Sequence, residues 1–192
     1  MGRLHPAFAG DHMIFLETPL QGAYLISVEP ICDERGYFAR TFCREEFILH
    51  GLNPDIMQSN VSYNKRPGTL RGMHYQSAPY AESKLIQCLQ GSVYDVIIDL
   101  RPDSPTYTQW FAATLTDSSR TLLYVPEGLA HGFQTLSEDT ILSYQMGRRF
   151  QPGLGAGIRW NDPYFEITWP MTPTVISERD QQYPDFETAL GG

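Results

Sequence analysis

The sequence has little of several features that mark common classes of protein. It contains only three cysteines, Cys32, Cys43 and Cys88, and no CxxC spacing. This pattern predicts neither a disulfide framework nor a zinc knuckle, so we expect reduced, structural thiols. No apolar run approaches the ~20 residues that a membrane-spanning helix needs, and we therefore expect no membrane partner.

Positive charge is also scarce, since 14 Lys and Arg residues stand against 22 Asp and Glu residues and give a net charge of -8. A general nucleic-acid or membrane-surface binder needs a basic field to meet phosphate, so we expect neither partner. A small anionic ligand stays possible because a pyrophosphate needs only a few local cations. Four candidates for that role are Arg35, Arg71, Lys84 and Arg179.

The length of 192 residues predicts one domain over residues 1–192, large enough to bury a sizeable core. Residues 1 to about 13 are irregular, with Pro6 and Gly10, and are expected to form a loosely held tail or an edge segment. The same segment lacks the apolar core and cleavage site of a secretory signal, and Pro6 replaces the Ser or Thr of a myristoylation motif. We therefore expect a cytoplasmic protein.

Short apolar or β-branched segments dominate the rest of the chain and are separated by turn residues. Many short strands at close spacing predict an all-β sandwich or barrel and argue against a parallel α/β sheet. A short helix is predicted over residues 44–50, because Gly51 follows at a position typical of a helix C-terminus. Strands are expected over residues 24–30, 58–64, 109–115, 121–125, 132–136 and 140–146.

Three further segments carry specific expectations. Residues 84–101 contain two apolar runs broken at Gln90 and Gly91, which predicts a β-hairpin. The polar segment 58–64 is consistent either with a strand that lines a cavity or with a solvated edge strand. Ser177 and Asp180 have the spacing of a capping box at the start of a short helix.

The segment GTLRGMHYQ, residues 68–76, places Arg71 and His74 three residues apart. Taken alone, and with only five His in the chain, His74 is more readily explained as a structural residue of a core or a turn. The later order PEGLAH, which ends at His131, resembles the second motif of the cupin (jelly-roll) superfamily. Metal-binding cupins have H-x-H plus a nearby Glu in their first motif, whereas this chain has Gln76 at the second His position, with Glu82 nearby. These donors are a poor set for iron, manganese or zinc, so we predict no metal.

Several motifs in the same order make the resemblance more specific. DERGYF, QSNVSYN, GTLRGMHYQ, YVPEGLAHGF, RWNDP and SERD occur between about residues 24 and 180. Over this span the chain resembles the cupin-fold nucleotide-sugar epimerases typified by the dTDP-4-dehydrorhamnose 3,5-epimerase family. Related ketoisomerases carry a second His just after the first, and Gln76 does not fit that pattern.

The resemblance implies a cupin-type jelly-roll barrel or sandwich with a few short helices. It also implies epimerisation at C3 and C5 of a nucleotide-linked 4-keto-6-deoxyhexose, with no cofactor. The expected partners are the nucleotide-sugar substrate and a second copy of the chain, in a homodimer whose amino-terminal segment reaches the partner's site.

The roles of individual residues follow from the same resemblance. His74 matches the base that removes the C–H proton, and Asp180 matches the carboxylate that orients it. One carboxylate cannot fully serve both His74 and a capping box, so we favour the pairing with His74. Tyr144 matches the acid on the opposite face of the sugar, and Lys84 matches the cation beside the 4-keto oxygen.

The positions that match substrate contacts are Arg71, His131, Arg35, Gln58, Asn60, Phe150 and Arg179. Departures from the best-known members gather at the nucleotide end. Arg40 and Ser59 replace acidic residues, Phe150 replaces a stacking Tyr, Gly155 replaces a Glu, and Arg179 replaces a Lys. The alternatives left open are a C3-only epimerase, a CDP- or GDP-linked substrate, a metal-dependent cupin and a non-catalytic sugar-nucleotide binder.

Overall fold

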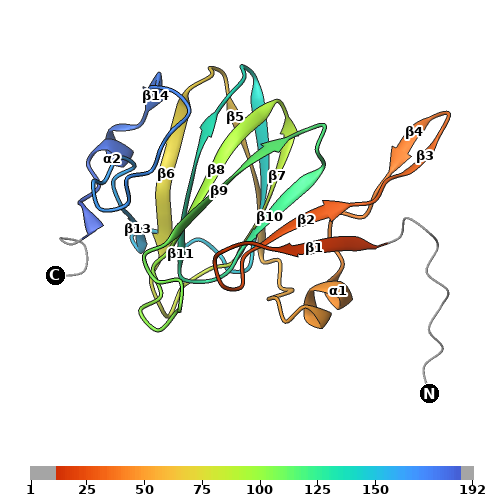
Figure 1. The fold of residues 1–192 in the computed structure, drawn as a ribbon, viewed down its shortest axis with the longest axis horizontal. Helices are drawn as coiled ribbons and strands as arrows, with labels where there is room; N and C mark the ends of the chain where they lie inside the picture. Colours follow the sequence, from red (N-terminus) through yellow and green to blue (C-terminus); the bar gives the residue numbers. More distant parts are fainter. Residues whose placement is uncertain (1–11, 187–192) are drawn as a thin grey trace.

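The computed structural model describes residues 12–186, which form two facing antiparallel sheets with two short helices (Figure 1). The predicted all-β jelly-roll class is therefore confirmed. In spatial order, the first sheet contains β1 (Met13–Glu17), β2 (Tyr24–Val28), β10 (Thr121–Val125), β7 (Lys84–Gln90), β12 (Thr140–Met146) and β5 (Gln58–Asn64).

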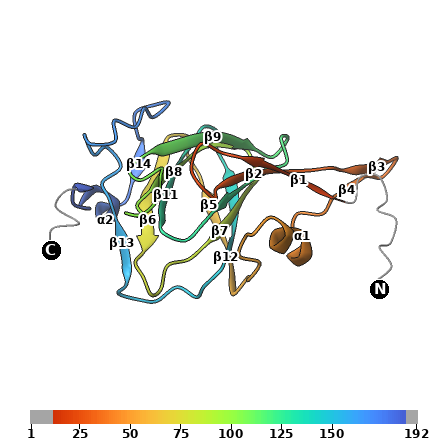
Figure 2. The same cartoon turned by 60° about the horizontal axis from the view of Figure 1, so that its bottom comes forward.

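The second sheet contains β13 (Gly155–Gly157), β6 (Thr69–Gln76), β11 (Leu129–Thr135), β8 (Ser92–Asp99) and β9 (Trp110–Thr116), and β14 (Val175–Ile176) runs parallel to β6. The short strands β3 (Ile31–Asp33) and β4 (Gly36–Phe38) form a separate hairpin. Figure 2 shows this hairpin extending away from both sheets, as Figure 1 also does.

The core lies between the two sheets, where strands of both contribute to one apolar cluster. Ile86 of the first sheet packs in it with Val93 and Ile97 of the second. Each fully buried aliphatic side chain of this kind contributes about 1.5–3 kcal/mol. Alternate residues of β8, Val96 and Ile98, belong to another buried cluster, so this central strand is covered on both faces.

The two helices fix peripheral parts of the chain. Helix α1 (Arg44–Leu49) places Phe47 against Tyr124 of β10, with ring centroids 5.7 Å apart. Helix α2 (Glu178–Gln181) lies beside β6 at the carboxyl-terminal end of the described chain (Figure 1). The helix predicted over residues 44–50 is confirmed, with His50 as its C-cap.

The predicted hairpin over residues 84–101 is wrong, although both of its strands exist. β7 pairs with β10 and β12 in the first sheet, whereas β8 pairs with β9 and β11 in the second. The chain crosses from one sheet to the other at Gly91, whose φ of 79° suits glycine. A pair of apolar runs looks the same in sequence whether its strands are neighbours or face each other across a core.

The segment expected as a tail or an edge segment meets β1, the edge strand of the first sheet, at its last residue. The predicted tail, residues 1–13, overlaps β1, because Met13 is buried and its backbone N–H donates to Glu46 Oε2 at 2.8 Å. Residues 1–11 lie outside the described part of the chain.

No helix between residues 12 and 186 combines the length and the apolar character required to cross a membrane. The cysteines in this part of the chain are free, and burial raises the pKa of the Cys88 thiol to about 11.

Candidate active site

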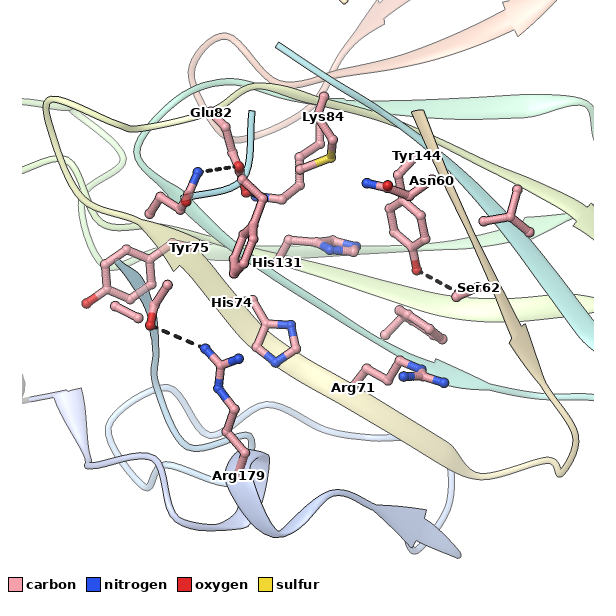
Figure 3. Close-up of a pocket in the computed structure, with 17 residues that line it drawn as sticks. Asn60, Ser62, Arg71, His74, Tyr75, Glu82, Lys84, His131, Tyr144 and Arg179 are labelled. Atoms are coloured by element: carbon pink, nitrogen blue, oxygen red, sulfur yellow. Dashed lines mark hydrogen bonds and ion pairs between the residues drawn. The ribbon is translucent and has the colours of Figure 1, made fainter. Parts of the chain in front are cut away.

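A cavity of about 320 Å³ opens between the two sheets, with walls formed by β5, β7 and β12 on one side and β6, β11 and β13 on the other. Strand β5 is the edge strand of the first sheet, and it also contributes Asn60 and Ser62 to this cavity. Segment 58–64 is therefore both an edge strand and a strand that lines a cavity, so both interpretations are confirmed. The predicted site residues that line the cavity are Asn60, Arg71, His74, Lys84, His131, Tyr144, Phe150 and Arg179 (Figure 3).

His74 projects from β6 and pairs with Asp180 of α2, with 2.8 Å between His74 Nε2 and Asp180 Oδ1. The other carboxylate oxygen, Asp180 Oδ2, accepts a hydrogen bond from the Gly72 backbone N–H at 3.2 Å. Burial alone would raise the pKa of Asp180, but the hydrogen bond and charge of His74 and the other donors outweigh it and lower that pKa. An ionised carboxylate only accepts, so His74 Nε2 carries the proton and Nδ1 is the basic nitrogen.

The expected competition between helix capping and the His74 pairing does not occur. Ser177 Oγ accepts a hydrogen bond from the backbone N–H of Asp180 at 3.1 Å, which caps α2. The carboxylate of Asp180 stays available for His74 and Gly72. Ser177 therefore supplies the cap, and the side chain of Asp180 pairs with His74.

Tyr144 stands on β12, in the sheet opposite to His74, and its hydroxyl lies 3.2 Å from Ser62 Oγ (Figure 3). Burial raises the pKa of the Tyr144 phenol and outweighs the hydrogen bond with Ser62. The phenol is therefore protonated at neutral pH and can donate. The cavity therefore has an imidazole on one wall and a protonated phenol on the other.

Lys84 begins β7 and is buried at the cavity, where its Nζ lies 3.0 Å from Glu82 Oε1. Glu82 Oε2 accepts from Gln76 Nε2, so the amide at the second His position of metal-binding cupins is committed to a carboxylate. Within residues 12–186, no three His, Cys, Asp or Glu side chains gather in a way that could hold a metal ion.

His131 of β11 is buried opposite His74 in the β6–β11 ladder, and its Nε2 lies 2.8 Å from Asp95 Oδ1. Asp95 was missed by the sequence reasoning, although a charged residue inside the apolar run VYDVIID was a visible signal. Burial raises the pKa of Asp95, although the charge and the hydrogen bond of His131 act to lower it. The site therefore contains a second imidazole–carboxylate pair.

The rim of the cavity carries cations and an exposed aromatic ring. Arg71 Nε donates to Asn64 Oδ1 at 2.8 Å, and Arg179 Nη2 donates to the carbonyl of Gly155 at 3.3 Å. Phe150 is about half exposed beside them. A Cβ on Gly155 would lie 3.1 Å from Arg179 Nη2 and 3.4 Å from Phe150 Cε2.

Two predicted substrate contacts lie outside the lining of this cavity. Gln58 supports the rim indirectly, because its Oε1 accepts from the Phe150 N–H at 3.2 Å and its Nε2 donates to Asn60 Oδ1 at 3.0 Å. Arg35 sits at the tip of the β3–β4 hairpin, with 86% of its side chain exposed and an ion pair to Asp33. The structure does not bring Arg35 to the cavity of its own chain.

A jelly roll whose cavity holds a His–Asp pair on one sheet and a protonated tyrosine on the other has the groups that an isomerase working by proton transfer needs. The profile of a family described as dTDP-4-dehydrorhamnose 3,5-epimerase matches residues 17–188. The chain therefore belongs to the dTDP-4-dehydrorhamnose 3,5-epimerase family, which is a family of isomerases.

Individual relatives agree over nearly the whole chain. The dTDP-4-dehydrorhamnose 3,5-epimerase of Sinorhizobium fredii is 38% identical over 92% of this chain and 91% of its own length. The crystal structure of dTDP-4-dehydrorhamnose 3,5-epimerase from Bacillus anthracis, with TDP and pyrophosphate bound, has a TM-score of 0.87 and 38% identity and covers 91% of this chain and 99% of its own. The Legionella pneumophila dTDP-6-deoxy-D-glucose-3,5-epimerase in complex with dTDP-4-keto-L-rhamnose has a TM-score of 0.85 and 32% identity. The match covers 91% of this chain and 93% of that chain.

Proposed function

We propose that this protein epimerises C3 and C5 of a dTDP-linked 4-keto-6-deoxyhexose, and that it needs no cofactor. The observation that carries the proposal is the placement of the His74–Asp180 pair and Tyr144 on opposite walls of one cavity. Inversion at a carbon requires proton removal from one face and proton return to the other, and this arrangement suits both steps.

The proposed reaction begins when His74 Nδ1 takes a proton from the carbon beside the ketone. The electron pair of the broken C–H bond moves into an enolate, and Asp180 stabilises the imidazolium that forms. The ammonium of Lys84 stabilises the negative oxygen. Tyr144 then donates its proton to the opposite face of the carbon. Exchange with water restores Tyr144 and His74, so the net change is an isomerisation.

The nucleotide part of the substrate is proposed to bind at the rim of the cavity. Phe150 offers an aromatic face for the base, although it lacks a hydroxyl. The guanidinium groups of Arg71 and Arg179 suit the pyrophosphate because they can bind phosphate oxygens bidentately. Arg35 is proposed to complete this end from a second subunit of a homodimer. The expected cytoplasmic location stays a prediction.

The experiment is turnover of dTDP-4-keto-6-deoxyglucose in deuterium oxide, with incorporation at C3 and C5 followed by mass spectrometry and NMR. We expect solvent deuterium at both carbons in the wild type and none with His74→Ala. Label at C3 alone would replace this proposal by a C3-only epimerase. Label only with CDP or GDP analogues would change the nucleotide, and the absence of any label would refute the activity. A preparation that loses its activity with a chelator would refute the cofactor-independent reaction.

A further inference from the structure

Glu82 is a buried carboxylate at the cavity to which the proposed reaction gives no role. Its side chain is only 7% exposed, and among the described residues that line the cavity it is the only carboxylate. An unpaired carboxylate there would repel an anionic nucleotide sugar and would be costly to bury. Its placement therefore has to be explained by its partners.

Both oxygens of Glu82 are engaged by different groups. Oε1 lies 3.0 Å from Lys84 Nζ, and Oε2 accepts from Gln76 Nε2. Gln76 is itself fixed, since its Nε2 also donates to the Tyr80 carbonyl at 3.2 Å and its Oε1 accepts from the Gln151 N–H at 3.0 Å. A fixed amide thus holds a carboxylate, which in turn holds the ammonium.

We infer that Glu82 is a positioning residue, held by Gln76, that fixes the ammonium of Lys84 at the place where the enolate oxygen forms. This inference rests on the proposed function. A lysine side chain has four rotatable bonds, and a charge contributes most to catalysis when it is already in place as negative charge develops. Because neither oxygen of Glu82 is free, it does not act as an acid or a base itself.

The test is a double-mutant cycle between Glu82→Gln and Lys84→Met. A glutamine at position 82 has one acceptor, which cannot serve both Gln76 Nε2 and Lys84 Nζ. We expect Glu82→Gln to lower kcat by about 10- to 100-fold and to change KM by less than about twofold. In the Lys84→Met background the same substitution should change kcat by less than about twofold, since its target is gone.

Either of two outcomes with Glu82→Gln would overturn the inference. The first is a Glu82→Gln enzyme whose kcat stays within about twofold of the wild type. The second is a double variant in which the two losses multiply, because a general structural role acts in both backgrounds. If Glu82→Gln does not fold, Glu82→Asp tests the inference instead. Aspartate keeps the negative charge, but its side chain is one methylene shorter, so the carboxylate lies farther from Lys84. A wild-type kcat for Glu82→Asp would also reject the inference.

Glu127→Gln is the matched control. Glu127 also pairs with a cation, since its Oε1 lies 3.8 Å from Arg148 Nε, but it is 42% exposed and does not line the cavity. We expect its kcat to equal that of the wild type. Wild-type turnover is measured first: its absence refutes the proposed function, whereas a fully active Glu82→Gln refutes only the positioning role.

Discussion

At the scale of single residues, Asp180 determines which nitrogen of His74 is basic. In Asp180→Asn the amide oxygen would accept from the Gly72 N–H, so the NH₂ group would face His74 Nε2. Nε2 would then have to accept, and the proton would move to Nδ1, which blocks the base. We expect kcat to fall by about 10²- to 10⁴-fold, as measured by steady-state turnover of the keto sugar.

The control for this variant is Ser177→Ala, which removes the cap of α2 but keeps the carboxylate. It should cost about 1 kcal/mol of stability and leave kcat nearly unchanged. An Asp180→Asn enzyme that is folded and within about tenfold of wild-type kcat would contradict the assigned tautomer.

Tyr144 permits a separate prediction, because proton removal and proton return occur on different walls. In Tyr144→Phe, His74 can still remove the proton and return one to the same face. Solvent deuterium should therefore enter the substrate without inversion, while net epimerisation falls by about 10²- to 10⁴-fold. NMR of the recovered sugar separates exchange from inversion. Equal loss of both processes would show that Tyr144 acts before the enolate forms.

The sequence predicted the reacting residues more completely than the residues that support them. The roles expected for His74, Tyr144 and Lys84 came from motifs that resemble those of a known family, and the structure brings all three residues to one cavity. Asp95 pairs with the distant His131, and Glu82 contacts Lys84 at the start of β7, so both contacts depend on how the strands pair and which side chains are buried. Single-residue reasoning has no access to that information.

At the scale of elements, two glycines let β6, which carries His74, approach β11 closely. Gly72 has a φ of 150°, and a Cβ there would lie 2.7 Å from the Cα of Gly132, which cannot move aside as a side chain could. We expect Gly72→Ala to lower the free energy of unfolding by on the order of 3 kcal/mol. It should also lower kcat, because the Gly72 N–H donates to Asp180 and a shift of β6 would move that carboxylate. Thermal unfolding and turnover would measure both effects.

Gly153→Ala is the control for backbone strain alone. Its φ of 86° is also unfavourable for alanine, but nothing lies within 4 Å of the added Cβ. Gly153→Ala should lower the free energy of unfolding by about 1 kcal/mol. Equal destabilisation by Gly72→Ala and Gly153→Ala would show that the close approach of β6 and β11 is unimportant.

The turn after β8 depends on the buried Asp99. Burial alone would raise the pKa of Asp99, but hydrogen bonds from Arg101, Ser104 and Thr106 outweigh it and lower that pKa to about 2. The resulting stabilisation, about 2 kcal/mol, is present above the ordinary carboxyl pKa of about 4 and is lost as pH falls toward 2. Asp99→Asn should therefore lower the unfolding free energy at pH 7 and flatten its fall between about pH 4 and pH 2.

Urea unfolding at several pH values measures this effect. Asp103→Asn in the same turn is the control, because Asp103 is exposed. If Asp99→Asn keeps the acid sensitivity of the wild type, the network around Asp99 does not supply it.

Elements themselves were more predictable than their pairing. The runs at 84–90 and 92–99 were read correctly as strands, since β-branched residues and the Gly91 break are local signals. Their assignment to opposite sheets could not be predicted from the sequence, because side chains of both strands pack in the same core cluster. The sheet in which each strand lies is decided by the whole jelly roll.

At the scale of the whole molecule, the β3–β4 hairpin extends away from the sheets (Figure 1). It carries large apolar side chains that are exposed. Ile31, Tyr37 and Phe38 are 44%, 57% and 72% exposed. An exposed apolar cluster on an extended element is typical of an interface, which supports the proposed homodimer. Arg35 at the hairpin tip would then act in the site of the second subunit.

This proposal predicts complementation between two defective variants. Arg35→Ala should lower kcat/KM by about 10- to 100-fold through loss of a charge-assisted contact, and His74→Ala should be inactive. In a hybrid dimer one site would contain both lesions and the other neither. Random mixing makes half of the dimers hybrid, so refolding the two variants together should restore about one quarter of wild-type activity.

A mixture of His74→Ala and Asp180→Asn is the control, since both lesions affect the same cavity and every hybrid site stays defective. Native mass spectrometry counts the hybrid dimers in each mixture. Hybrid dimers that form without recovered activity in the Arg35→Ala mixture would place Arg35 outside the partner's site. Recovery in the control mixture would show instead that the variants regain activity by another route. Recovery in the first mixture alone requires that His74 and Arg35 of one site come from different chains.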